Sequence, residues 1–269
     1  MIKPGEIQKH AAINKVKDGQ IEKDYVITWI LYGISRNKFL HENLIFKGGT
    51  VIKKAYFKDY RYSEDLDFTL KNDKIDNENL FSEFENLFEF VLEEANIPLK
   101  RNPETNFESG NVNFYIAYGG PLGGTFGKKD LKIDFTRNEL LCFKEQDKSI
   151  FRVYSDLEKD FSIKCYQKQE VLIEKMRSLM ERTQPRDIYD LWYLFEFGSL
   201  KIIDYSNEFK RKLSHKNFNH ENLIDKINEK EHKFKGMWEK YLGNQIHNLP
   251  DFDGVYRELM KNLREVNFK

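Results

Sequence analysis

Hydrophobic residues in the first hundred positions repeat mostly at helical spacing. In residues 20–40, Tyr25, Trp29 and Tyr32 recur every three or four positions, which predicts a helix. Residues 78–95 show the same period with a polar opposite face, which predicts an amphipathic helix. A shorter helical pattern covers residues 50–57, directly after the glycine pair 48–49.

Short apolar or alternating stretches predict strands between these helices, at residues 44–47, 64–70, 111–117 and 131–136. In the second stretch, Asp65, Asp67 and Thr69 fall on one face of the predicted strand. Its other face is apolar. The glycine-rich connection between the last two strands is typical of a hairpin.

From residue 167 onward the pattern is almost entirely helical. One helix is predicted up to the break at Pro185, and a second is predicted at 188–197, before Gly198. Residues 206–269 are lysine-rich and helical, with an interruption at Pro250. We therefore predict an α+β protein, with a mixed-sheet domain at 1–160 and a helical domain at 161–269.

Composition narrows the class of protein but gives no direct evidence of function. The 269 residues carry 44 basic and 44 acidic side chains, so any site for a polyanion must be a local patch. Two cysteines, Cys142 and Cys165, are too few for a disulfide framework or a zinc site. The first residues lack the apolar segment of a signal peptide, and the longest apolar run, 25–34, is too short to span a bilayer. We expect a cytoplasmic protein without a membrane partner.

The acidic pair on the second predicted strand is the first candidate for chemistry. Asp65 and Asp67 project from one face, where two carboxylates repel each other unless a cation lies between them. Mg²⁺ prefers oxygen ligands and commonly combines carboxylates with substrate phosphates. Asp134, on another predicted strand with apolar neighbours, is the candidate third ligand. This set predicts a Mg²⁺ or Mn²⁺ site.

The glycines before the short helix are the candidate phosphate site. Gly48 and Gly49 allow backbone N–H groups to approach phosphate oxygens at a helix N-terminus, and Thr50 adds a hydroxyl donor. A second GGT, at residues 123–125, has no helix and no acidic pair after it, and we interpret it as a turn. Together, GGT and Asp-x-Asp predict a site for a nucleoside triphosphate and its metal ions.

A basic segment lies farther along the chain. Lys175 and Arg182 are two helical turns apart, with Arg186 beyond the Pro185 break, and Asp187 and Asp190 open the next helix. These cations are candidates for contact with a triphosphate. Simpler interpretations remain for each group. The aspartates also fit a solvated strand face or the first turn of a helix, and the lysines and arginines fit the polar face of an amphipathic helix. The basic stretch at 210–216 fits either an RNA-binding surface or a solvated helix.

The chain resembles the AbiEii/AbiGii-type nucleotidyltransferase toxins, which lie within the DNA polymerase β-like nucleotidyltransferase superfamily. The resemblance rests on four stretches in the family's order: FKGGTVIKKAYF, RYSEDLDFTL, LKIDF and EKMRSLMERTQPRDIYDLWYL. It implies a nucleotidyltransferase fold, meaning a small mixed sheet with flanking helices, followed by a helical domain.

The resemblance also implies roles for residues. Gly48, Gly49 and Thr50 would hold the triphosphate, and Asp65 and Asp67 would bind the metal. Asp134 would be the third metal ligand and would orient or deprotonate the acceptor hydroxyl. Lys175 and Asp187 would belong to the catalytic set, and Lys175, Arg182 and Arg186 to the nucleotide-binding set.

The function implied is transfer of NMP from an NTP to an acceptor hydroxyl, with tRNA or another RNA as acceptor. The setting would be a bacterial toxin–antitoxin or abortive-infection system with a cognate antitoxin. Three alternatives stay open: a module of this fold that binds nucleotide or RNA without turnover, a transferase that modifies a protein side chain, and a phosphotransfer or hydrolase activity on the same metals.

Overall fold

The computed structural model describes residues 1–108 and 111–265, and in these residues seven strands form one mixed sheet with the order β3-β4-β5-β2-β1-β7-β6. Strands β1 and β2 are antiparallel, whereas β2 pairs with β5 in parallel. The four predicted strands are all present. The strands are β1 Leu44–Lys47, β2 Leu66–Leu70, β3 Leu99–Glu108, β4 Asn111–Tyr118, β5 Asp130–Thr136, β6 Gln146–Ser149 and β7 Ser162–Cys165.

The helices around the sheet follow the predicted periodicity. The Asp76 side chain accepts a hydrogen bond from the backbone N–H of Asn79 at 2.7 Å and so caps the start of the long amphipathic helix α5. That helix ends where Asn96 adopts a left-handed conformation, with φ of 55°. The helical elements of this part are α1 Pro4–Asn14, α2 Asp18–Arg36, α3 Lys38–Asn43, α4 Gly48–Val51, the π-helix η1 Ile52–Tyr56 and α5 Asn77–Ala95.

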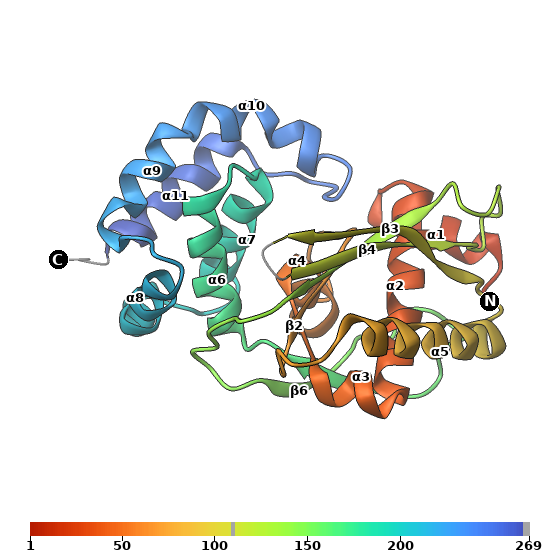
Figure 1. Cartoon of the computed structure of the whole chain (residues 1–269). Helices are drawn as coiled ribbons and strands as arrows, with labels where there is room; N and C mark the ends of the chain where they lie inside the picture. The colour runs from red at the N-terminus through yellow and green to blue at the C-terminus, as the bar shows by residue number, and fades with distance from the viewer. Residues whose placement is uncertain (109–110, 266–269) are drawn as a thin grey trace. The chain divides into compact units, whose positions relative to one another are not determined.

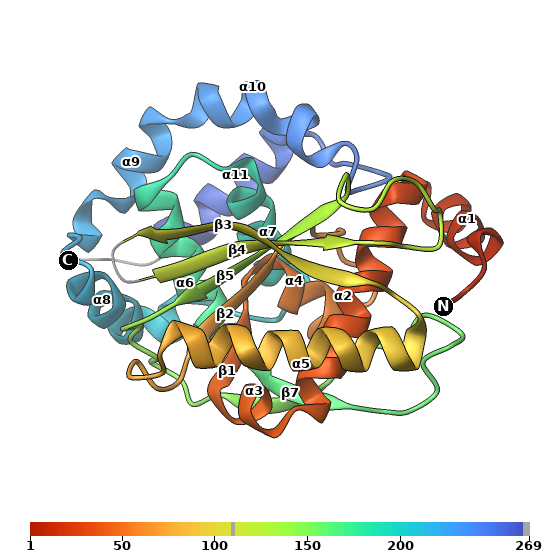
Figure 2. The ribbon, with the colours of Figure 1, turned by 45° about the vertical axis from the view of Figure 1, so that its right-hand side comes forward.

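The hydrophobic core lies between the sheet and α5, which runs across the strands in Figure 2. Phe46, Phe68 and Phe135 are register neighbours on β1, β2 and β5, and all three are buried. Phe84 of α5 packs edge-on against Phe135, with ring centroids 5.5 Å apart. Burial of each such ring stabilises the fold by about 1.5–3 kcal/mol. Side chains alternate along a strand, so the positions next to these rings point to the opposite face.

The chain divides into two compact units. The first consists of Met1–Glu139 and Glu145–Cys165, and the second of Leu140–Lys144 and Tyr166–Lys269. The first unit extends past residue 160 because β7 pairs in parallel with β1, through Phe46 and Cys165, and so belongs to the sheet. Cys142 and Cys165 are both free thiols.

The second unit is helical, as the sequence pattern predicts (Figure 1). Pro185 occupies the first turn of α7, where the N–H that proline lacks would have no helical partner. It therefore begins α7, and the helical pattern of α6 ends before it. Within the described residues, no helix is both long and apolar enough to cross a membrane. The main helices are α6 Lys168–Glu181, α7 Pro185–Glu196, α8 Ser206–His215, α9 Leu223–Glu229, α10 Glu231–Leu242 and α11 Phe252–Arg264.

Candidate active site

A polar row crosses the face of the sheet opposite the phenylalanines. Asp67 on β2 is the register neighbour of Asp134 on β5, in a parallel pair. Paired positions on neighbouring strands, about 4.8 Å apart, carry their side chains on the same face. Lys47 on β1 pairs with Asp67, and Asn113 on β4 pairs with Asp134. We call these four residues the carboxylate row.

The glycine turn lies directly against this row. Gly48 has a φ of +79°, and a Cβ atom built on it would lie 2.2 Å from Oδ2 of Asp67. Only glycine gives both the left-handed conformation and this close approach. The two sequence motifs, GGT and Asp-x-Asp, therefore meet in space, with the start of α4 beside the Asp67 carboxylate.

Asp65 and Thr50 form a second link between the motifs. Asp65 precedes β2, which begins at Leu66, so the prediction that it lies within the strand is wrong. The Thr50 hydroxyl donates a hydrogen bond to the backbone carbonyl of Asp65 at 2.5 Å. Thr50 is 1% exposed, so its side chain anchors the segment that leads into β2.

Two lysines on this face were not singled out in the sequence. Lys47 is 7% exposed, and its ammonium donates to the Thr136 hydroxyl on β5 at 2.9 Å. Lys132 forms an ion pair of 2.9 Å with Asp134 from two positions earlier on the same strand. The available signals were the position of Lys47 immediately before the glycines and the two-residue spacing of Lys132 from Asp134. Both cations offset the repulsion between the carboxylates.

The pKa of Asp134 is raised above its ordinary value. Burial is the largest cause, and the neighbouring Asp67 adds to it, while the hydrogen bond from Lys132 opposes it. A carboxyl with a raised pKa is a stronger base once ionised. Asp134 is therefore suited to accept a proton.

This shift predicts how Asp134 affects stability. A carboxyl whose pKa is raised in the folded state destabilises the fold once the pH exceeds the ordinary aspartate value of about 3.9. The loss of stability reaches its full size once the pH exceeds the raised pKa of Asp134. We expect Asp134→Asn to melt at a higher temperature than the wild type at pH 8, and this advantage to vanish at the acid end of the series. Thermal melting at several pH values checks this, and a lower melting temperature at pH 8 would contradict it.

The two GGT copies provide a matched pair of variants. Gly123 also has a positive φ, +67°, but it lies in the β4–β5 connection and a Cβ there would have nothing within 4 Å. We expect Gly123→Ala to cost about 1–2 kcal/mol of stability, from the left-handed backbone alone, and to leave intact the nucleotide transfer that the family resemblance implies.

Gly48→Ala adds the clash with Asp67 to the same backbone cost. We expect nucleotide transfer to fall by about a hundredfold, because the carboxylate must move by the order of an ångström. Parallel denaturation and transfer assays on both variants test this. Equal activity of the two variants would show that the contact between Gly48 and Asp67 has no functional role.

The donor set of the carboxylate row fits a divalent ion that also binds substrate. Among the residues that the structure describes, no group of three or more His, Cys, Asp and Glu side chains is assembled as a metal site. Mg²⁺ is usually held by one or two carboxylates together with substrate phosphates, and the adjacent pair Asp67 and Asp134 meets that requirement. Asp65 lies one residue before β2.

The helical unit contains the remaining predicted site residues. Lys175 on α6 is 6% exposed, and its ammonium lies 2.7 Å from a carboxylate oxygen of Asp187 and 2.7 Å from one of Asp190, both on α7. Both aspartates are fully buried. Burial alone would raise the pKa of Asp187, but Lys175 and Arg182 outweigh it and hold this pKa below its ordinary value. In this geometry Lys175 joins α6 to α7.

The two predicted arginines differ in their surroundings. Arg182 is 54% exposed, and its Nε donates to Asp187 at 2.8 Å. Arg186, in the first turn of α7, is half-buried. The predicted catalytic roles of Lys175 and Asp187, and the predicted nucleotide contacts of Lys175, Arg182 and Arg186, stay predictions.

Comparison with known proteins relates the whole arrangement to one family. The family model described as "Nucleotidyl transferase AbiEii toxin, Type IV TA system" matches residues 29–258. The MenT4 nucleotidyltransferase toxin of Mycobacterium tuberculosis H37Rv is similar in structure, with a TM-score of 0.65 and 15% identity, over 100% of this chain and 91% of MenT4.

JHP933 from Helicobacter pylori is also similar, with a TM-score of 0.53 and 15% identity, over 93% of this chain and 92% of that one. At these identities the two structures support the fold. Comparison with curated protein sequences gives no match.

Proposed function

Because this chain belongs to the family of AbiEii nucleotidyltransferase toxins of type IV toxin–antitoxin systems, we propose that its carboxylate row transfers NMP from an NTP to a hydroxyl of RNA, with tRNA as the first candidate. The proposal rests on one observation above all. Gly48, at the start of α4, lies against Asp67, which is in register with Asp134. The glycine turn and a carboxylate pair thus meet at one place.

The transfer is a single displacement at phosphorus. The acceptor hydroxyl oxygen forms a bond to the α-phosphorus of the NTP, and the bond between this phosphorus and the oxygen bridging to the β-phosphate breaks. Pyrophosphate leaves with the electrons of that bond. The hydroxyl proton passes to Asp134, which its raised pKa suits for the role.

The other residues of the site bind and orient. The backbone N–H groups at the start of α4, at Gly48 and Gly49, would donate hydrogen bonds to the phosphate oxygens of the NTP. Lys47 and Lys132 offset negative charge on this face. Asp67 and Asp134, with Asp65 beside them, would hold Mg²⁺ or Mn²⁺, which would neutralise charge on the transferring phosphate.

The acceptor is identified by incubating the protein with Mg²⁺, total bacterial RNA and each of the four NTPs labelled at the α-phosphate. We expect label on RNA of tRNA size from one preferred NTP. Label on a protein band instead would keep the chemistry and favour the protein-modifying alternative. NTP binding with no label on any acceptor and no pyrophosphate release would favour the module without turnover.

The family also implies a protein partner. A type IV toxin–antitoxin system pairs the toxin with an antitoxin, so we expect a cognate antitoxin for this chain. Co-expression of the adjacent gene with this chain should relieve growth arrest if that gene encodes the antitoxin. Arrest that persists unchanged would exclude that gene product as the partner.

A further inference from the structure

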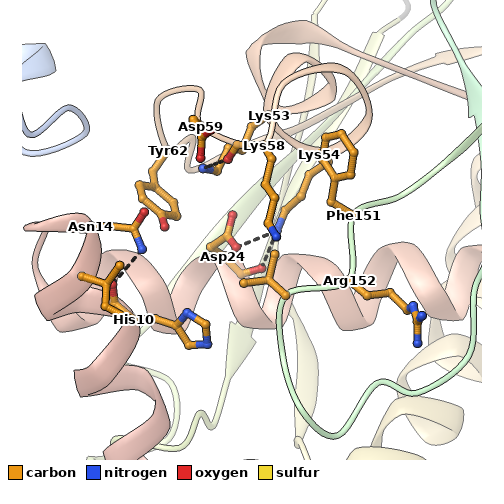
Figure 3. A pocket seen from close by; sticks show the side chains of 12 residues that line it. His10, Asn14, Asp24, Lys53, Lys54, Lys58, Asp59, Tyr62, Phe151 and Arg152 are labelled. Atoms are coloured by element: carbon orange, nitrogen blue, oxygen red, sulfur yellow. Dashed lines mark hydrogen bonds and ion pairs between the residues drawn. The ribbon is translucent and has the colours of Figure 1, made fainter.

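The first unit has a second polar site, a cavity of about 300 Å³ away from the carboxylate row (Figure 3). Its walls come from segments far apart in the sequence: α1, α2, the π-helix η1, the loop after it and residues 151–153. The volume is at the lower end of the range for small-ligand sites. The side chains that matter for its chemistry are those of Asn14, Asp24, Lys53, Lys58, Asp59 and Tyr62.

The innermost carboxylate of this cavity is already satisfied. Asp24 is 3% exposed and accepts hydrogen bonds from the Lys54 ammonium at 2.6 Å and the Tyr154 hydroxyl at 2.7 Å. Lys54 in turn has three acceptors, namely two oxygens of Asp24 and the Thr28 hydroxyl. This pair is therefore neutral and contributes little net charge to the cavity.

Lys53 is different from Lys54, its neighbour in sequence. It is 8% exposed, and its ammonium donates to the backbone carbonyl of Lys58 at 2.6 Å and lies 4.2 Å from the centre of the Tyr62 ring. Within residues 1–108 and 111–265, no carboxylate lies within ion-pair distance of it. The pKa of Lys53 is lowered to about 8, chiefly by burial; Lys54 adds to this lowering, whereas Asp24 and Asp59 oppose it. A buried cation in this state gains stability from an anion.

The rest of the lining adds further donors. The Tyr62 ring is buried, and in the part of the chain that the structure describes its hydroxyl makes no hydrogen bond. Lys58 is exposed at the rim, also without an ion pair among the described residues. Asn14 donates one amide hydrogen to the His10 carbonyl, and its second amide hydrogen makes no hydrogen bond within the described residues. Asp59, also exposed, is the one carboxylate of the lining that Lys54 does not neutralise.

We propose that this cavity is a phosphate-binding site, which holds a phosphate group of a nucleotide between Lys53, Lys58 and the Tyr62 hydroxyl. The oxygens of a phosphate can accept hydrogen bonds from the donors of this lining. Its negative charge can pair with the Lys53 ammonium, which has no carboxylate partner among the described residues. Phe151, which is half-buried in the same lining, gives an adjoining aromatic surface for a base. The phosphate comes either from a free nucleotide or from an RNA chain.

The backbone around Lys53 supports a functional role. Residues 52–56 form a π-helix, closed by the hydrogen bond from the Phe57 N–H to the Ile52 carbonyl at 2.8 Å. Single π-turns within helices are frequent at functional sites. The same helical segment begins at Gly48, so Lys53 lies about 7–8 Å farther along its axis. The inference does not depend on the proposed transfer reaction.

Lysine acylation followed by mass spectrometry tests this site at the level of single residues. The wild-type protein is labelled at pH 8 alone and with inorganic phosphate, AMP, adenosine or an eight-nucleotide single-stranded RNA. At ten times the dissociation constant of a probe, we expect labelling of Lys53 and Lys58 to fall about tenfold. Exposed Lys128 is the internal control, and Lys47 reports separately on the carboxylate row.

Two substitutions at the exposed rim of the cavity should change the phosphate protection of Lys53 in opposite directions. Lys58→Gln should weaken phosphate protection of Lys53 by about tenfold, because it removes a hydrogen bond to a charged group. Asp59→Asn should strengthen it, because it removes a like charge. Neither side chain is buried, so neither variant should affect folding.

Each outcome decides the proposal. Tighter protection by RNA than by AMP supports it and identifies RNA as the source of the phosphate, whereas tighter protection by AMP or inorganic phosphate supports it with a free ligand. Equal protection by adenosine and AMP would overturn the phosphate assignment. Unchanged labelling of Lys53 with every probe would overturn the site altogether.

Discussion

Replacing Asp67 by Asn should reduce nucleotide transfer by on the order of a thousandfold, because the site loses several kcal/mol of charge stabilisation at the transferring phosphate. Asp67 is the residue at which Gly48, Lys47 and Asp134 all meet. Asn has nearly the same shape as Asp and removes a charge that repels Asp134, so the melting temperature should be unchanged or higher. The measurement is the initial rate of label transfer from NTP to RNA, alongside a thermal melt.

Asp130→Asn is the matched control for this variant. Asp130 lies on β5, like Asp134, but at the exposed start of the strand, four residues and about 13 Å away. The control should transfer at the wild-type rate. A comparable loss in Asp130→Asn would mean that general electrostatics of the sheet cause the effect. Wild-type transfer by Asp67→Asn would remove Asp67 from the mechanism.

Replacing Lys175 by Met should have the largest effect on stability, a loss of about 3–5 kcal/mol. Its ammonium is shared by the fully buried carboxylates of Asp187 and Asp190. Without it, the two buried negative charges lose the cation that they share, and Arg182 still contacts Asp187 from the surface. Urea denaturation measures the change directly. Lys233→Met, at an exposed position on α10, is the control and should change stability by less than about 0.5 kcal/mol.

A second substitution separates loss of charge balance from loss of packing. Adding Asp190→Asn to Lys175→Met removes one of the two buried negative charges, so the double variant should recover part of the lost stability. Wild-type stability of Lys175→Met would show that the buried ion cluster does not hold α6 against α7. A double variant less stable than Lys175→Met alone would show that charge balance is not the cause.

The two aspartates of the carboxylate row, Asp67 and Asp134, were predictable from sequence because two local patterns specify them. Polar and apolar residues alternate around Asp67 and Asp134. Because Phe68 and Phe135 must be buried on one face of their strands, the aspartates lie on the other face. The register that makes the two aspartates neighbours depends on pairing between β2 and β5, which are far apart in the chain. No local pattern contains that pairing, so the sequence did not reveal that β2 and β5 lie side by side.

Other elements were missed for different reasons. The stretch that forms β3 has Pro103 and little alternation, and its strand character comes from pairing with β4. Strands β6 and β7 are four residues each, too short for a period to be counted. Lys175 was recognised as a cation, but its partners Asp187 and Asp190 become visible only when α6 and α7 pack together. The cavity around Lys53 is assembled from segments that no single motif covers.

Intact-mass analysis of RNA after incubation with the protein, Mg²⁺ and NTPs tests the central claim most directly. If the carboxylate row transfers nucleotides, the acceptor gains the mass of one or more NMP residues, one pyrophosphate is released for each, and both changes are lost in Asp67→Asn. A gain equal to a phosphoryl group alone would contradict the proposed displacement at the α-phosphorus. RNA of unchanged mass, with no modified protein and no pyrophosphate, would contradict turnover at this site.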